Sequence, residues 1–388
     1  MPDTKGVEVK VVPALAAVDA ANWDGVANPA PALYNPFVSH AFLLALEQAR
    51  CVGPGTGWMP RHLVVEGDDG RIKAAAPCYA KTHSQGEYVF DHSWADAYMQ
   101  AGGSYYPKLQ IAVPFTPVPG PRLLVEPGAQ AAANEQVLAA AAIELAGQAG
   151  FSSVHLTFID GALQERLGGL GFLKRTGQQF HWTNQAYATF EEFLATFASR
   201  KRKAVRKERE QAVSAGIEIE HIKGRDITEA HWDAFFDFYM DTGSRKWGRP
   251  YLNRTFFSLL GNAMPERCLL VMARRAGRYI AGALNMIGGD CLFGRYWGAT
   301  EHHPFLHFEV CYYQAIEYAI AHRLARVEAG AQGEHKLARG YMPVETYSAH
   351  WIADPHLRRA IARHLERERL AVSEANEDLA ELGPYRKA

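Results

Sequence analysis

Short apolar runs separated by glycine and proline dominate the first third of the chain. The stretch 61–80 contains two such runs joined at Asp69-Gly70, a pattern that predicts a β-hairpin. The proline-rich stretch 105–125 predicts edge strands and loops, because proline cannot donate to the hydrogen-bond ladder of a central strand. An apolar segment over about 130–149 predicts a long helix with Gly150 as its C-cap.

One order of predicted elements occurs twice: helix, strand, short glycine-bearing helical segment, final strand. The first copy starts with the helix that ends at Gly150, and the second with a helix that Pro304 opens as its first residue. The final strands carry matching His-Trp pairs, His181-Trp182 and His350-Trp351. Three strand candidates over 268–299 precede the second copy. The repeated order predicts an internal duplication, and the alternation of strands and helices predicts α/β domains with mixed sheets.

The composition is that of an ordinary globular protein. At roughly 150 residues per domain, 388 residues predict two or three domains, and we expect a boundary near residue 190, giving domains 1–190 and 191–388. The formal net charge is −1. A nucleic acid or membrane surface would therefore have to bind at a local basic patch, and we expect no DNA partner.

The sequence shows no signal for export or for a membrane span. The start, "MPDTKGVEVKVVP", lacks the apolar core of a signal peptide. The apolar stretch 129–150 is interrupted by polar residues and falls short of the roughly 20 apolar residues that span a bilayer. The five cysteines show no C-x-x-C spacing, which favours reduced thiols. We therefore expect a cytoplasmic protein.

Several segments resemble a known family. "LGGLGF" (167–172) is similar to the closing half of a GNAT acyltransferase domain. The basic run from residue 198, "FGRYWG" and "GAQGEHKLARGY" resemble the FemAB-like tandem-GNAT proteins, predicted bacterial N-acyltransferases related to peptidoglycan-bridge enzymes. The resemblance covers about residues 30–370. It implies two tandem GNAT-like domains with a substrate cleft between them, in which an amine of a small molecule or peptide attacks an activated acyl group. It implies no tightly bound cofactor, and acyl-CoA or aminoacyl-tRNA as co-substrate.

The stretch 295–309, "RYWGATEHHPFLHFE", is the densest in reactive side chains. The resemblance places it beside the reacting acyl group. Acyl transfer needs a base for the attacking amine and a proton for the leaving group. We predict Glu309 or His307 as the base and Tyr296 as the proton donor, with Arg295, Trp297 and His303 binding substrate. A metal site is the rival interpretation, but only His303 and His307 have i, i+4 spacing and no H-E-x-x-H pattern occurs, so we predict none.

The phosphate-binding loop of acyl-CoA-dependent GNAT enzymes, R/Q-x-x-G-x-G/A, is missing before this helix. The corresponding stretch, "GATEHHPF", has one early glycine only. FemAB relatives lack the loop as well and take aminoacyl-tRNA. The departure leaves both donors open.

The stretch 328–341, "EAGAQGEHKLARGY", matches neither the P-loop nor the dinucleotide-binding pattern. In the context of the resemblance it follows a strand and opens a small helix beside the cleft. We predict that it forms one wall of the acyl-transfer site, and a surface turn with solvated charges is the alternative. Its predicted site residues are His335, as a catalytic group, and four that bind substrate: Glu328, Glu334, Lys336 and Arg339.

The run 199–210, "SRKRKAVRKERE", holds seven Lys and Arg and two Glu. It predicts a helix that is either an ordinary solvated one or a phosphate-binding patch for a tRNA acceptor end, a nucleotide or CoA. A second basic segment lies at 242–253. The predicted phosphate-binding residues are Arg202, Lys203, Arg206, Lys207, Arg245 and Lys246.

The stretch 90–110 is rich in aromatic residues with scattered charges, which suits either a lined pocket or packing beneath a loop. Lys108 stands out, because a charge beside two tyrosines and Pro107 needs a partner. We predict substrate contacts from Asp91, Trp94, Tyr106 and Lys108. The alternative to an enzyme is a non-catalytic protein that uses duplicated GNAT domains to recognise a cell-wall amino sugar or peptide.

Overall fold

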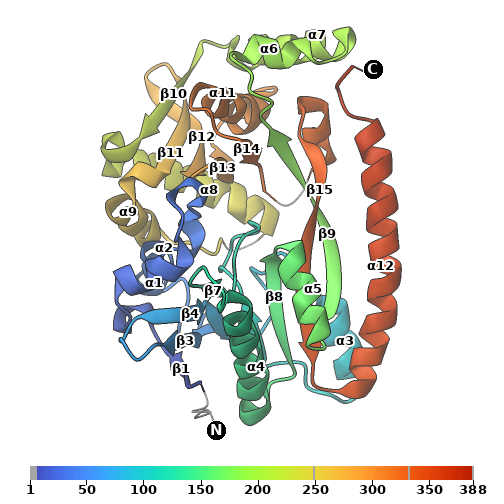
Figure 1. The fold of residues 1–388 in the computed structure, drawn as a ribbon. Helices are drawn as coiled ribbons and strands as arrows, with labels where there is room; N and C mark the ends of the chain where they lie inside the picture. Colours follow the sequence, from blue (N-terminus) through green and yellow to red (C-terminus); the bar gives the residue numbers. More distant parts are fainter. Residues whose placement is uncertain (1–6, 248–249, 331–332, 387–388) are drawn as a thin grey trace. The chain divides into compact units, whose positions relative to one another are not determined.

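The computed structural model describes residues 7–247, 250–330 and 333–386 (Figure 1). The chain forms two compact units, each built from separate segments. Unit 1 comprises Met1–Pro31, Phe37–Gly177 and Glu345–Ser373, and unit 2 comprises Ala32–Pro36, Gln178–Val344 and Glu374–Ala388. Each unit thus takes in residues from both sides of position 190, and the domain boundary expected there stays a prediction.

Unit 1 contains two groups of strands. β1, β3, β4 and β7 form one sheet, and β15, β8, β6, β5 and β2 follow one another in a second ladder. Its strands are β1 (Val9–Val12), β2 (Trp58–Pro60), β3 (His62–Glu66), β4 (Ile72–Ala76), β5 (Cys78–Lys81), β6 (Lys108–Ile111), β7 (Leu124–Val125), β8 (Ser153–Ile159) and β15 (Met342–Ile352). Its helices are α1 (Ala20–Ala27), α2 (His40–Gln48), α3 (His92–Gln100), α4 (Ala131–Ala149), α5 (Gly161–Gly169) and most of α12 (Pro355–Glu381).

The local predictions for unit 1 are confirmed except at the proline-rich stretch. β3 and β4 form the expected hairpin, and Gly150 ends α4 in the left-handed conformation (φ 69°). β6, however, lies between β5 and β8 rather than at an edge. The prediction of an edge strand is wrong there because the prolines flank Lys108–Ile111 and leave the backbone donors of that segment free to pair.

Unit 2 is built on strands in the order β10, β11, β12, β13, β14, β9. Neighbours are antiparallel except β13 and β14, which are parallel. These strands are β9 (Leu173–Thr183), β10 (Ile217–Lys223), β11 (Cys268–Arg275), β12 (Arg278–Ile287), β13 (Cys291–Ala299) and β14 (Arg326–Glu328). The helices are α6 (Phe190–Ala195), α7 (Ser199–Val213), α8 (Glu229–Trp247), α9 (Arg254–Ala263), α10 (Leu306–Phe308), a π-helical turn η6 (Glu309–Tyr313), α11 (Gln314–Ala321) and a 3-10 helix η7 (Glu334–Arg339).

The predicted repeat of elements is present. α4, β8, α5 and β9 follow one another in the first half, as α11, β14, η7 and β15 do in the second. Both His-Trp pairs lie near the ends of eleven-residue strands. Pro304, however, does not open the helix, because Phe305 has a left-handed backbone (φ 63°) and helical structure begins at Leu306.

The core of unit 2 contains alternating residues of the strands and the buried face of the helical segment 306–321, among them Val271, Val310 and Ile316. In the described part of the chain, no helix is long and apolar enough to cross a membrane.

Candidate functional site

A cavity of about 130 Å³ opens in unit 2 where two parallel strands part. β13 pairs with β14 only through Cys291–Phe293, because β14 ends at Glu328, while β13 continues to Ala299. A β-bulge at Arg295 bends β13 at the same point. The cavity is lined by Ala283, Asn285, Gly294, Arg295, Tyr296, Trp297, His307, Cys311, Tyr312 and Ala329.

His307 faces this cavity from the first helical turn after Phe305. Its ring lies 5.2 Å from that of Trp297, 5.3 Å from Tyr312 and 6.1 Å from His335, measured between ring centroids. A hydrogen bond of 2.9 Å joins the Tyr312 hydroxyl to Nε2 of His335. Two imidazoles, one indole and one phenol therefore meet beside one small cavity, and imidazoles are groups that can take up and release protons.

Asn285, on β12, lines the same cavity and is 1% exposed. Among the described residues, neither its amide nitrogen nor its amide oxygen has a hydrogen-bond partner. Buried side-chain amides are nearly always paired. Sequence reasoning did not single out this residue, because an asparagine inside an apolar strand segment has no motif around it.

Glu309 lies away from the cavity in a network of charges. Its carboxylate accepts hydrogen bonds from the Arg209 guanidinium at 2.8 and 3.0 Å and from the Gln314 amide at 2.7 Å. Arg209 also binds Glu317, at 2.8 and 2.9 Å. Both oxygens of the Glu309 carboxylate are therefore occupied by partners within unit 2. The contacts give Glu309 a structural role, clamping α7 to the helical segment 306–321.

The stretch 328–341 contributes buried charges near the cavity. Lys336 is 2% exposed and donates to the Gly330 carbonyl at 3.0 Å. Burial lowers the pKa of Lys336 to about 8, partly opposed by the charge of Cys311. The Arg339 guanidinium lies 3.4 Å from the ring centroid of Phe308 and binds Glu208.

The two glutamates of this stretch lie differently. Burial raises the pKa of Glu328, whose Oε1 accepts from Arg326 at 3.1 Å. Glu334 is exposed. Lys336 and Glu328 are therefore buried, whereas Glu334 lies on the surface.

Of the remaining predicted residues of the second half, three line the cavity and one lies in a separate ion pair. Tyr296 and Trp297 line the cavity, and the Tyr296 ring lies 5.2 Å from that of Tyr239. Arg295 also lines it and lies over the Tyr296 ring at 5.1 Å. His303 instead pairs with Glu301 at 2.9 Å on the surface, where Arg275 holds the same carboxylate.

Helix α7 separates its charges between two faces. Val205 and Ala212 are buried and Arg209 turns inward to its glutamates, whereas Lys203 and Lys207 are exposed. No ion pair of Arg202, Lys203 or Lys207 with another described residue is present, while Arg206 pairs with the exposed Glu191. Arg245 and Lys246 lie in α8, where their side chains fall outside the described residues.

The predicted substrate residues of the first half form a buried network in unit 1. Lys108 is fully buried and donates to Glu87 at 2.7 Å, to Asp91 at 2.5 Å and to Ser84 at 2.9 Å. Tyr106 bonds to Ser84 at 2.7 Å. All three donor positions of the Lys108 ammonium are used within unit 1, so the partner that this charge requires is internal.

Two histidines extend this network. Nδ1 of His155 lies 2.7 Å from Nδ1 of His350, and the Trp94 ring packs edge-on against His350 at 5.1 Å. Burial lowers the pKa of His155 to about 3 and lowers that of His350. One ring must donate and the other accept, so the two Nδ1 atoms cannot both carry a proton.

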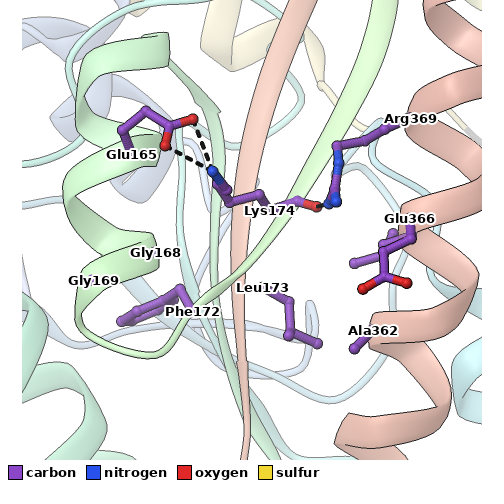
Figure 2. Close-up of a pocket in the computed structure, with 10 residues that line it drawn as sticks. Glu165, Gly168, Gly169, Phe172, Leu173, Lys174, Ala362, Glu366 and Arg369 are labelled. Atoms are coloured by element: carbon purple, nitrogen blue, oxygen red, sulfur yellow. Dashed lines mark hydrogen bonds and ion pairs between the residues drawn. The ribbon is translucent and has the colours of Figure 1, made fainter.

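Unit 1 also contains a larger hollow of about 370 Å³, shown in Figure 2. Three of its four charged side chains have partners in the hollow itself. Lys174 binds both carboxylate oxygens of Glu165 at 2.7 and 2.9 Å, and Arg369 donates to the Lys174 carbonyl at 2.8 Å (Figure 2). We place the candidate site at the smaller cavity of unit 2, because that cavity combines a buried unpaired amide with titratable rings.

The described residues contain no group of three or more His, Cys, Asp or Glu placed to hold a metal ion.

Comparison with known proteins adds a family and a fold. The profile of the FemAB-like family, described as peptidoglycan biosynthesis/recognition, matches residues 14–387. A search of the curated proteins found no match.

Among solved structures, FemX covers 92% of this chain and 100% of its own, with 13% identity and a TM-score of 0.56. The structure of L-PGS from Bacillus licheniformis covers 86% of this chain and 98% of its own, with 10% identity and a TM-score of 0.51. At such identities the likeness concerns the fold, and the predicted α/β fold with mixed sheets is confirmed.

Proposed function

The chain belongs to the FemAB-like family of transferases, and we propose that it moves an acyl or aminoacyl group from an activated donor to an amine in the cavity of unit 2. The observation that carries the proposal is the position of His307, Tyr296 and Asn285 around one cavity at the parting of β13 and β14. The predicted location of the cleft between the two domains stays a prediction.

The reaction is an attack of the amine nitrogen on the acyl carbonyl. The new N–C bond forms as the bond from that carbon to the ester oxygen or thioester sulfur breaks. His307 takes the proton that the nitrogen loses, since it is the imidazole on the cavity wall. Tyr296 gives a proton to the leaving group. Lys336, whose ammonium donates a hydrogen bond to the Gly330 carbonyl, provides positive charge that stabilises the developing oxyanion.

The donor carries phosphate, as aminoacyl-tRNA or acyl-CoA. The exposed lysines of α7 support this, because Lys203 and Lys207 lie one turn apart and have no carboxylate partner among the described residues. Such a face attracts phosphate without reading sequence. The acceptor is a small molecule or peptide with a free amine, in keeping with the family's link to peptidoglycan.

The test is a transfer assay with acetyl-CoA or alanyl-tRNA as donor and a muropeptide with a free amine as acceptor. We expect one donor to raise the melting temperature, since a ligand that binds the native state stabilises it, and to be consumed in the presence of the muropeptide. His307→Gln should lower the rate by about 10²–10⁴-fold, the usual contribution of a general base.

The matched control is His302→Gln, because His302 is exposed and does not line the cavity. Its rate should equal that of the unmodified protein. A different result would reject the transferase: the muropeptide raises the melting temperature, while neither donor does so and neither is consumed. The chain would then be a non-catalytic recognition protein.

A further inference from the structure

The amide of Asn285 is the least satisfied polar group at the cavity. It is 1% exposed, and both of its polar atoms lack a partner among the described residues. Asn285 lies opposite Gly294 in the ladder of β12 and β13. A Cβ added at Gly294 would stand 3.5 Å from Oδ1 of Asn285 and 3.5 Å from the backbone carbonyl of Glu328. The missing side chain of Gly294 therefore leaves open the space that the Asn285 amide faces.

The cost of this arrangement indicates a ligand. A buried amide that has lost water and gained no partner destabilises the protein, and an apolar residue of the same shape would remove that penalty. Residues that lower stability in this way are concentrated at functional sites. The space beside Gly294 gives the amide somewhere to find its partner.

We propose that Asn285 binds a secondary amide of the substrate. Oδ1 accepts the N–H of the ligand amide, and Nδ2 donates to a second acceptor of the ligand, because the N–H and C=O of one trans amide point in opposite directions. The cavity of about 130 Å³ holds a few waters or an amide with its flanking carbons.

This inference rests on the proposed function and names a chemical group that the substrate must contain. Secondary amides occur in the peptide link, in the acetamido group of an N-acetyl sugar and in the pantetheine arm of CoA. A simple acyl group such as acetate has no N–H for Oδ1. Asn285 thus acts as a specificity residue, holding the substrate while His307 and Tyr296 exchange protons with it.

Three probes separate the sources of the amide: N-acetylalanine methylamide, N-acetylglucosamine and CoA. Their binding is measured by ligand-observed NMR on the full chain, which requires no turnover. We expect at least one probe to bind the unmodified protein, and Asn285→Leu to weaken it tenfold or more. The melting temperature of Asn285→Leu, without ligand, should equal or exceed that of the unmodified protein.

A second variant approaches the same contact from the other strand. Gly294→Ala fits its surroundings, since the new Cβ would meet ordinary contact distances of 3.5–3.6 Å. It should weaken the same probe tenfold or more by filling the space before Oδ1. Gly147→Ala, in α4 with nothing within 4 Å of the added Cβ, is the matched control and should bind as the unmodified protein does.

Two outcomes would overturn the inference. One is a melting temperature of Asn285→Leu several degrees lower, which would show that the amide holds the fold. The other concerns the probes: each binds the unmodified protein and both cavity variants equally well, or no probe binds any of the three proteins. Loss of probe binding in the two variants, without transfer from any donor, would uphold the amide site and reject the transferase reaction alone.

Discussion

Single residues in unit 2 divide into those that we propose to react and those whose contacts hold the fold. Glu309 belongs to the second group, because the residue is 3% exposed and its carboxylate is bound by Arg209 and Gln314. Glu309→Gln should lower the free energy of unfolding by about 1–3 kcal/mol, the cost of a charged hydrogen bond lost in a buried place. Urea denaturation measures it.

Glu317→Gln is the control for this substitution. Glu317 binds the same guanidinium, but its side chain is 36% exposed. Its replacement should cost under about 1 kcal/mol, as exposed ion pairs do. Two results would contradict the structural role and favour a catalytic one for Glu309. One is an equal loss of unfolding free energy in both variants, and the other is a Glu309→Gln protein that is fully stable but transfers no acyl group.

Lys336 connects a single pKa with the rate. Burial lowers its pKa to about 8, so its positive charge is lost as the pH rises through that value. If that charge stabilises the oxyanion, transfer falls above pH 8, and Lys336→Met abolishes this limb of the pH–rate profile. Lys336→Arg should move the fall to higher pH. A profile that is the same in all three proteins would exclude Lys336 from the reaction.

At the scale of elements, α7 presents one face to the core and the other to solvent. Replacing Arg202, Lys203 and Lys207 by glutamine should weaken binding of tRNA at least tenfold at low salt and flatten its dependence on salt by about two to three charges. Filter binding across a salt series measures both effects.

The matched control replaces three exposed arginines on α12: Arg359, Arg363 and Arg367. The net charge of this variant changes equally, so unchanged binding would assign the effect to α7 itself. Equal weakening in both variants would indicate attraction by total charge.

The elements also show how far a pattern alone predicts structure. The hairpin, the helix that Gly150 ends and the repeated order of elements follow from local periodicity and turn chemistry, and all are confirmed. The partners of Lys108 and Glu309 come from segments distant in sequence, so periodicity could not identify them. Asn285 was missed for a related reason, because its importance lies in the partners that it lacks.

For the whole molecule, the buried histidines of unit 1 make stability depend on pH. In the unfolded chain His155 and His350 titrate near 6.5, whereas in the folded protein the pKa of His155 is about 3 and that of His350 is also lowered. Between these values the unfolded state binds more protons. The free energy of unfolding therefore falls as the pH drops below 6.5, by up to about 1.4 kcal/mol per pH unit for each histidine.

Urea denaturation at pH 7.5, 6.0 and 5.0 follows this loss. His364→Gln, at an exposed position, should leave the slope unchanged. The double variant His155→Gln/His350→Gln should flatten it by up to two protons. A slope unaffected by the double variant would place the acid sensitivity elsewhere.

The chain path of unit 1 bears on its synthesis. His155 and His350 are 195 positions apart, and β8 is bordered by β15 from the last quarter of the chain. Ribosomes synthesise about 5–20 residues each second. On the order of ten seconds or more therefore pass between the synthesis of β8 and that of its partner strand β15. Throughout that interval one edge of β8 remains open to pairing, an aggregation hazard. The growing chain is therefore a natural client for chaperones, and its yield on expression should depend on them more than the stability of the finished protein suggests.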